Sequence, residues 1–192
     1  MNPIGHVFGI LLRPESAWKA IAAERGDTSY LLLNYVAPLA LVPAVCGFIG
    51  ASIVGVSVSV GTFRVPMLSG AIGAAIGYLL SFATVYLLAL FIDWLAPTFD
   101  AKSNFPNALK LSIYSHTPVW LAGIFFVMPR LRFLAFFGVY GCYLAFTGVV
   151  PLMKAPRDRA TLYAVAIIIC AFILAVLLGI FQARLSSFAW LR

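Results

Sequence analysis

Charged residues are scarce in this chain. Only 10% of its 192 residues are Asp, Glu, Lys or Arg, and only six of these are acidic, whereas 63% of all residues are hydrophobic. A water-soluble surface cannot be built from so few polar groups. The composition therefore excludes an ordinary soluble globular domain.

Residues that bind metals or carry out catalysis are scarce as well. Cys46, Cys142 and Cys170 fall in apolar stretches without metal-site spacing, so we expect them to pack as small apolar groups. The only two histidines are His116, in an apolar stretch, and His6, near the amino terminus, which excludes a two-histidine site within one stretch. Neither paired carboxylates nor a nucleophile with its base is evident. We expect no catalytic residue, no metal and no cofactor, and we predict that the protein is not an enzyme.

Long stretches without any charged residue dominate the chain. They cover residues 30–54, 67–92, 111–129, 133–153 and 160–183, and each holds 19 or more residues. A helix needs about 20 apolar residues to cross the roughly 30 Å hydrocarbon core of a bilayer. Barrel strands would be about ten residues long and would alternate in polarity. The sequence predicts an all-α integral membrane protein, with a five-transmembrane-helix bundle over residues 30–192 after an amino-terminal segment over residues 1–29.

The distribution of Lys and Arg predicts the orientation of the bundle. With five spans, one side carries eight basic residues (Arg13, Lys19, Arg25, Lys102, Lys110, Lys154, Arg157 and Arg159) and the other carries five (Arg64, Arg130, Arg132, Arg184 and Arg192). Basic residues in short loops are retained in the cytoplasm, so we expect a cytoplasmic amino terminus and an external carboxyl terminus. Such loops contact anionic headgroups, so the net charge of +7 requires no nucleic-acid partner.

The amino-terminal segment is predicted to form an amphipathic interfacial helix. Pro14 suits the first turn of a helix, and Glu15 lies near its positive end. Trp18, Ile21 and Ala22 fall on one apolar face. This helix either lies along the cytoplasmic headgroups or packs across the base of the bundle, and the two arrangements are compatible.

Between the first two stretches, residues 55–66 alternate apolar and small polar side chains with a period of two. This period is typical of a β-strand. We expect a small β-hairpin outside the membrane, with its turn at Gly61 and Thr62 and its end at Pro66.

Small side chains recur every four residues in the second stretch, at Ser69, Gly73, Gly77 and Ser81. Such a ridge allows another helix to approach closely. Our main interpretation is packing of the second span against the first. A seam between two copies of the chain and a lipid groove are the alternatives.

Polar groups at membrane depth are the candidate binding residues, because they are costly to bury without a partner. We expect Asn34, Asp93 and Lys110 to meet in the cytoplasmic half of the bundle, with Asp93 paired to Lys110. The pair is either a site for a cation, a headgroup or a partner loop, or a structural ion pair at the interface.

The third stretch contains a second set of candidate binding residues, Tyr114, His116 and Pro118. Pro118 removes a backbone donor and is expected to kink the helix. We expect His116 to be a hydrogen-bonded side chain, with Tyr140, Tyr143 and Thr147 in the fourth stretch as candidate partners.

Several short motifs lie in a recognisable order along the chain. They are Arg13-Pro14-Glu15-Ser16-Ala17-Trp18, Tyr114-Ser115-His116-Thr117-Pro118, Pro129, Tyr140-Gly141-Cys142-Tyr143, Gly148, Pro156 and Tyr163. In this order and placement the chain resembles the Yip family, small five-span proteins named for interaction with Ypt/Rab GTPases. The resemblance implies a bacterial inner-membrane protein connected with membrane organisation or trafficking. Eukaryotic members carry a longer amino-terminal region whose motifs are absent here, so a Rab-type GTPase partner is not implied.

Two functions follow as hypotheses. The first is a non-enzymatic membrane protein that acts through contacts with membrane lipids, with other membrane proteins or with a second copy of itself. The alternative is a small transporter or channel for an ion or polar solute, with Asp93, Lys110 and His116 along its path.

Overall fold

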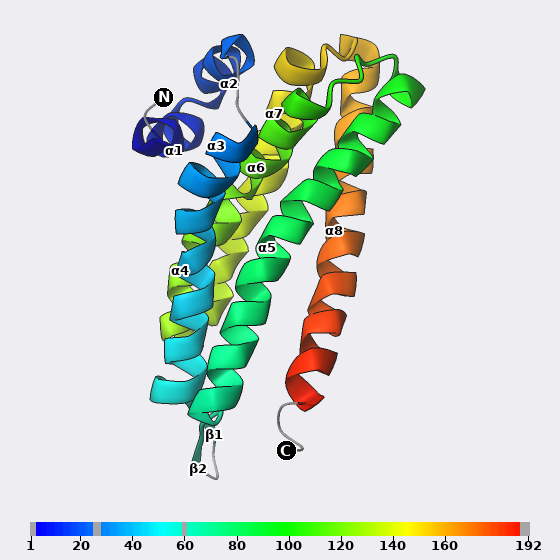
Figure 1. Cartoon of the computed structure of the whole chain (residues 1–192). Coiled ribbons are helices and arrows are strands. Elements are labelled where there is room, and N and C mark those ends of the chain that lie inside the picture. The colour runs from blue at the N-terminus through cyan, green and yellow to red at the C-terminus, as the bar shows by residue number, and fades with distance from the viewer. Residues whose placement is uncertain (1–2, 25–27, 59–60, 189–192) are drawn as a thin grey trace.

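The computed structural model describes residues 3–24, 28–58 and 61–188. Long helical rods lie side by side in one bundle, with two short helices at one end and a β-hairpin at the other (Figure 1). The amino-terminal helices and the last turns of α8 lie at opposite ends of the bundle (Figure 1).

The elements follow one another along the bundle. The short amino-terminal helices are α1 (Pro3–Leu12) and α2 (Pro14–Ala23). The first long rod joins α3 (Thr28–Leu31), the π-helix η1 (Leu32–Val36), α4 (Ala37–Phe48) and the π-helix η2 (Ile49–Val54). After β1 (Val56–Val58) and β2 (Gly61–Phe63) come α5 (Met67–Leu95), the 3₁₀ helix η3 (Ala96–Phe99), α6 (Phe105–Ala122), the 3₁₀ helices η4 (Gly123–Val127) and η5 (Pro129–Val139), α7 (Tyr140–Met153) and α8 (Arg157–Phe188).

Among the described residues, four helical segments are long and apolar enough to cross a membrane: Thr28–Val54, Met67–Phe99, Pro129–Met153 and Arg157–Leu185. They contain four of the five expected spans. The expected span at residues 111–129 is not one of the four. It corresponds to α6 and η4, and α6 carries Ser, Thr and His side chains in its middle turns.

Two α-helices, α1 and α2, form the amino-terminal arm, and Arg13 separates them. Pro14 occupies the first turn of α2 and Glu15 lies in the same turn, as predicted. Trp18 and Ile21 of α2 and Ile10 of α1 are almost completely buried. The arm therefore packs against the bundle through the apolar face that the sequence indicates.

The two strands pair antiparallel, with Val56 opposite Phe63 and Val58 opposite Gly61. The predicted turn at Gly61 and Thr62 is wrong, because both residues lie in β2 and pair with Val58 and Ser57 of β1. Gly55 ends η2 with a φ of 82°, a conformation that L-residues with side chains rarely adopt.

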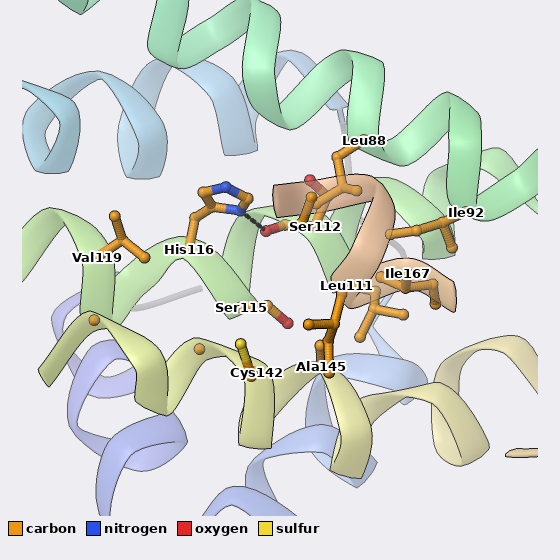
Figure 2. A pocket seen from close by; sticks show the side chains of 14 residues that line it. Leu88, Ile92, Leu111, Ser112, Ser115, His116, Val119, Cys142, Ala145 and Ile167 are labelled. Carbon is orange, nitrogen blue, oxygen red and sulfur yellow. Dashed lines mark hydrogen bonds between the residues drawn. The ribbon is translucent and has the colours of Figure 1, made fainter. Parts of the chain in front are cut away.

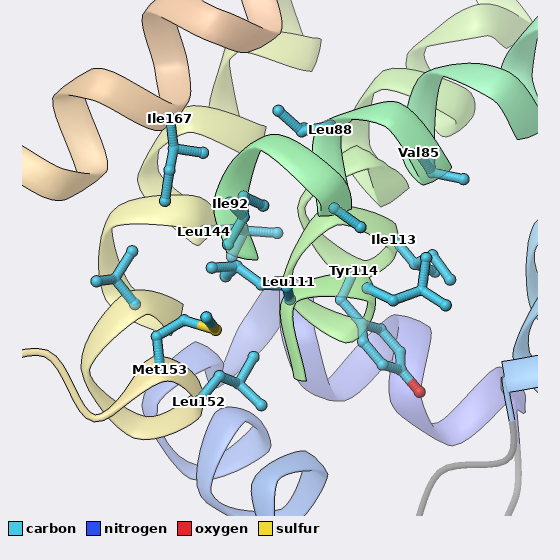
Figure 3. Close-up of a cluster of buried hydrophobic side chains, with 14 of the residues drawn as sticks. Val85, Leu88, Ile92, Leu111, Ile113, Tyr114, Leu144, Leu152, Met153 and Ile167 are labelled. Atoms are coloured by element: carbon cyan, nitrogen blue, oxygen red, sulfur yellow. The ribbon is translucent and has the colours of Figure 1, made fainter. Parts of the chain in front are cut away.

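The core is concentrated toward the arm. We call residues 3–24, 28–40, 81–120 and 140–174 the arm half, and residues 41–58, 61–80, 121–139 and 175–188 the hairpin half. The largest fully buried side chains all belong to the arm half and include Trp18, Tyr114 and Tyr163. Figure 3 shows α5, α6, α7 and α8 contributing to this cluster. In the described part of the hairpin half, the buried residues are all small: Gly50, Ser52, Gly55, Ser69, Ala122 and Gly123.

Candidate functional site

Most residues of helix α6 are buried, and it carries four of the six buried polar side chains of the described residues: Lys110, Ser112, Ser115 and Thr117. The Ser112 hydroxyl donates to the carbonyl of Val85 on α5 at 2.8 Å, and the hydroxyls of Tyr35 and Thr117 are 2.9 Å apart. His116 Nδ1 lies 2.9 Å from the carbonyl oxygen of Ser112. A carbonyl oxygen only accepts, so this contact requires a proton on Nδ1 and leaves Nε2 for other groups. The bonds of Ser112 and Thr117 join α6 to its neighbours, whereas that of His116 lies within α6.

Lys110, only 3% exposed, fastens the arm to α6. Its Nζ donates to the carbonyl oxygens of Ile21, at 3.0 Å, and Glu24, at 2.5 Å. Both carbonyls lie at the carboxyl end of α2, where unpaired carbonyls and the helix dipole favour a cation. The buried charge is thus used to hold the arm.

The predicted pair of Asp93 and Lys110 does not form among the described contacts. Asp93 instead accepts a hydrogen bond from the Ser103 hydroxyl at 2.9 Å. Asn34 is exposed and donates to the carbonyl of Tyr30, one turn earlier in its own helical rod, at 3.1 Å. The expected polar layer is therefore wrong, because Lys110 points toward the carbonyls of the arm.

Trp18 is the main anchor of the arm. Its indole Nε1 donates to the Thr147 hydroxyl of α7 at 3.1 Å, and its ring meets Tyr114 edge to face with centroids 6.2 Å apart. A Cβ at Gly148 would lie 2.8 Å from the indole ring. Gly148 therefore provides the space in α7 that the indole fills.

The remaining predicted site residues are dispersed. Tyr114 packs against Tyr35 with ring centroids 4.7 Å apart and is buried in the core. The Tyr140 hydroxyl donates to the carbonyl of Leu11 at 3.0 Å, and Tyr143 is 47% exposed. The structure thus gives His116 a carbonyl of its own helix, and not the two tyrosines, as its hydrogen-bond partner. Pro118 is buried within α6, which continues to Ala122.

A small cavity of about 90 Å³ lies beside the buried polar residues of α6 (Figure 2). Ser115, His116, Cys142 and Ile167 are among its lining residues. The Ser115 hydroxyl is buried and has no hydrogen-bond partner. The volume is well above the ~10–15 Å³ that one water needs, and a water bonded to Ser115 would satisfy the hydroxyl.

A much larger groove, of about 730 Å³, runs through the hairpin half. It lies between α4, α5 and α8, and His116 and Trp120 of α6 and Phe126 of η4 also line it. Small side chains of α4, η2, α5 and α8 form much of its wall, among them Ala44, Gly47, Ala51, Gly73, Ala74, Ala175 and Gly179. Its volume lies within the ~300–1,000 Å³ typical of small-molecule sites.

The ridge of small residues on α5 lines this groove. Ser69, Gly73, Gly77 and Ser81 all belong to its wall. A Cβ added at Gly73 would meet nothing within 4 Å, so the predicted tight contact with the first span is wrong at this position. At Gly77 the neighbour is Gln182 of α8, whose Nε2 also donates to the carbonyl of Gly73 at 3.2 Å.

The close helix contacts involve other glycines. A Cβ at Gly123 would lie 2.6 Å from the Cβ of Pro43, and Cβ atoms at Gly50 and Gly141 would clash with the carbonyl oxygens of Phe126 and Ser115. None of these glycines belongs to the repeat of small residues in α5. Each of them is a single glycine that faces another segment of the chain, and the sequence alone does not show which glycines do so.

Within the part of the chain that the structure describes, no group of three or more His, Cys, Asp or Glu residues could hold a metal ion. Cys46, Cys142 and Cys170 are free thiols.

Comparison with known proteins places this architecture in a family. A family model described as the Yip1 domain matches residues 8–178, most of the chain. The chain belongs to the Yip1 domain family. The match starts within α1 and ends within α8, so the Yip1 domain includes most of the arm, the buried polar segment of α6 and most of the groove wall.

Among curated proteins, the chain is similar to the inner membrane protein YohC of Escherichia coli strain K12, with 23% identity. The similarity covers 81% of this chain and 83% of that relative. The protein of the same name from Escherichia coli O6:H1 matches with the same identity and coverage. No solved structure matches the chain.

Proposed function

We propose that this Yip1-family chain is a non-enzymatic protein of the bacterial inner membrane that acts through contacts with lipids and with other membrane proteins, and that its groove holds the acyl chain of a membrane lipid. Apolar helices and the similarity to an inner membrane protein support the location. The groove supports the lipid contact and is the observation that carries the proposal.

The proposal includes a fifth span formed by α6 and η4, with the arm on the cytoplasmic side. A helix that faces lipid must be apolar, but a helix enclosed by other helices need not be. The middle turns of α6 are buried, and its Ser112 and Thr117 hydroxyls have hydrogen-bond partners inside the bundle. Enclosure therefore explains how a rod that is polar for a membrane helix crosses beside the four apolar ones.

The shape of the groove fits an acyl chain. Along α5 its wall extends from Ser69 to Thr84. Fifteen residues of helix rise about 22 Å, which exceeds half of the ~30 Å hydrocarbon core. The groove is therefore long enough to hold an acyl chain across one leaflet, and the small side chains of its wall leave room for that acyl chain.

The arm supports a second membrane contact. Phe8 and Leu12 lie one turn apart on α1 and are 61% and 76% exposed, although the opposite face of the arm is buried. Exposed apolar side chains at the end of a membrane bundle are stabilised by insertion at the headgroup boundary. We propose that the arm packs on the bundle and also touches the cytoplasmic interface.

A transporter or channel is less well supported. Its sequence-based path requires Asp93, Lys110 and His116 to act together. In the described residues these three side chains bind Ser103, the end of α2 and the carbonyl of Ser112, respectively. Each has a separate structural partner, so no continuous polar path motivates the transporter hypothesis.

Native mass spectrometry of the protein released from nanodiscs tests the groove. Gly73→Trp should place an indole in the groove, because Gly73 lines the groove and nothing lies within 4 Å of a Cβ there. We expect the wild-type protein to retain phospholipid and Gly73→Trp to lose it. The matched control is Leu79→Trp, at a position on the same helix that is 66% exposed, and it should retain lipid. Equal retention by both variants would show that the groove is not the lipid site.

A further inference from the structure

The two ends of the bundle carry different kinds of charge. The six acidic residues of the chain are Glu15, Glu24, Asp27, Asp93, Asp100 and Asp158. Five of them belong to the described arm half, and Asp27 lies outside the described residues. The described hairpin half carries Arg64, Arg130, Arg132 and Arg184, without an acidic residue. The described residues of this half therefore offer no carboxylate side chain to Arg64, Arg130 and Arg132.

The arginines lie where headgroups would be. Arg64 precedes the apolar segment Met67–Phe99 by three residues, and Arg130 is the second residue of the segment Pro129–Met153. Both side chains are exposed, as is that of Arg132. Gly55 keeps this end compact, because a Cβ there would lie 2.7 Å from Cγ of Arg64.

The groove reaches the same end of the bundle. Its wall includes Val65, the residue directly after Arg64, and Ala135 of η5, the helix that carries Arg130 and Arg132. The hydrogen bond from the Val65 N–H to the Ala51 carbonyl, at 3.0 Å, fixes the segment beside Arg64 to η2. The groove and the arginines Arg64, Arg130 and Arg132 thus lie at the same end of the bundle.

We propose that the occupant of the groove is an anionic glycerophospholipid, whose phosphate binds Arg64, Arg130 and Arg132 while one of its acyl chains lies against the small residues of α5. This inference rests on the proposed function and names its ligand. Guanidinium groups form paired, charge-assisted hydrogen bonds with phosphate oxygens. A headgroup with a net negative charge supplies a counter-charge for these three arginines, and a zwitterionic headgroup does not.

The test uses the full-length protein, delipidated in mild detergent, with two probes that have the same acyl chains: phosphatidylglycerol, which is anionic, and phosphatidylethanolamine, which is zwitterionic. Affinity is measured by native mass spectrometry and by the shift in unfolding midpoint. We expect tighter binding of phosphatidylglycerol. The double variant Arg130→Gln/Arg132→Gln should lose this preference, by about fivefold for each arginine removed.

The control is a second double variant, Lys154→Gln/Arg157→Gln, which removes the same charge at the arm end and should keep the preference. Inorganic phosphate alone should shift nothing, because it has no chain for the groove. Equal binding of the two lipids, an equal loss in both double variants, or a shift with phosphate alone would overturn the headgroup assignment and leave the groove intact. Failure of the wild-type protein to bind either lipid would instead overturn the proposed function as well.

Discussion

The arm half and the hairpin half of the bundle differ in what fills the space between their helices. In the arm half, Trp18, Tyr114 and Tyr163 fill the space between helices, and Lys110 and Ser112 join helices through backbone carbonyls. In the hairpin half the described buried residues are small, and a groove of about 730 Å³ separates the helices. One half is closed by its own side chains, and we propose that lipid closes the other.

The difference shows which parts of a membrane bundle the chain itself must stabilise. Lipid chains are as apolar as Leu, so helices in a membrane associate through close packing and hydrogen bonds. The arm half has both kinds of contact. The wall of the groove has fewer of them, although Gln182 bonds to the Gly73 carbonyl there, and we expect the groove to exchange its occupant without disturbing the arm half.

Removal of the main arm anchor should have the largest effect on stability. Trp18 is fully buried and hydrogen-bonded to Thr147. Trp18→Ala leaves a large cavity, and we expect it to lower the free energy of unfolding by roughly 3–5 kcal/mol. Trp94→Ala is the control, because Trp94 is 74% exposed. Unfolding in mixed micelles measures both variants, and equal losses would mean that the arm is not part of the core.

Loss of the buried cation should have the next largest effect. Lys110→Met removes two charge-assisted hydrogen bonds to the end of α2, and we expect a loss of about 1.5–3 kcal/mol. Limited proteolysis should then cut the arm faster than in the wild-type protein. Asp93 has a different partner, so Asp93→Asn should add to Lys110→Met without coupling. Coupling in that double-mutant cycle would restore the predicted Asp93–Lys110 pair.

The sequence predicted the positions of the apolar helices well. Four of the five expected stretches lie inside the membrane-length segments, because apolarity over about 20 residues is a local property. The helical arm was also predictable, since Pro14, Glu15 and the Trp18–Ile21 face are local signals. Both strands lie within residues 55–66, where the alternation predicts them. The predicted turn at Gly61 and Thr62 is wrong, because a period of two does not specify strand register.

Helix partners were not predictable in the same way. The four-residue spacing predicts a close helix contact at Gly73, but Gly73 faces the groove. Gly123 and Gly141 make close contacts instead. Opposite charge predicts a pair of Lys110 with Asp93. The partners of Lys110 are instead backbone carbonyls, which any sequence would provide. Which face of a helix meets which neighbour depends on the packing of the whole bundle, and a single sequence does not contain that information in local form.

A smaller effect separates two serines of α6. The Ser112 hydroxyl donates to Val85, whereas the Ser115 hydroxyl has no partner in the small cavity of the packed half. We expect Ser112→Ala to cost roughly 0.5–1.5 kcal/mol and Ser115→Ala to cost nothing measurable. Thermal unfolding in the same detergent compares the two variants. A larger loss for Ser115→Ala would show that its hydroxyl holds a structural water.

The most direct test of the difference between the two halves is one pair of leucine substitutions, compared by unfolding midpoint. In Gly141→Leu the new side chain meets the Ser115 carbonyl at the contact between α6 and α7, so we predict a loss of about 1–3 kcal/mol. In Gly73→Leu it enters the groove, and we predict an unchanged midpoint in detergent without lipid. A comparable loss for both variants would contradict the account, because it would mean that the hairpin half is closed by helix packing and has no room for a lipid chain.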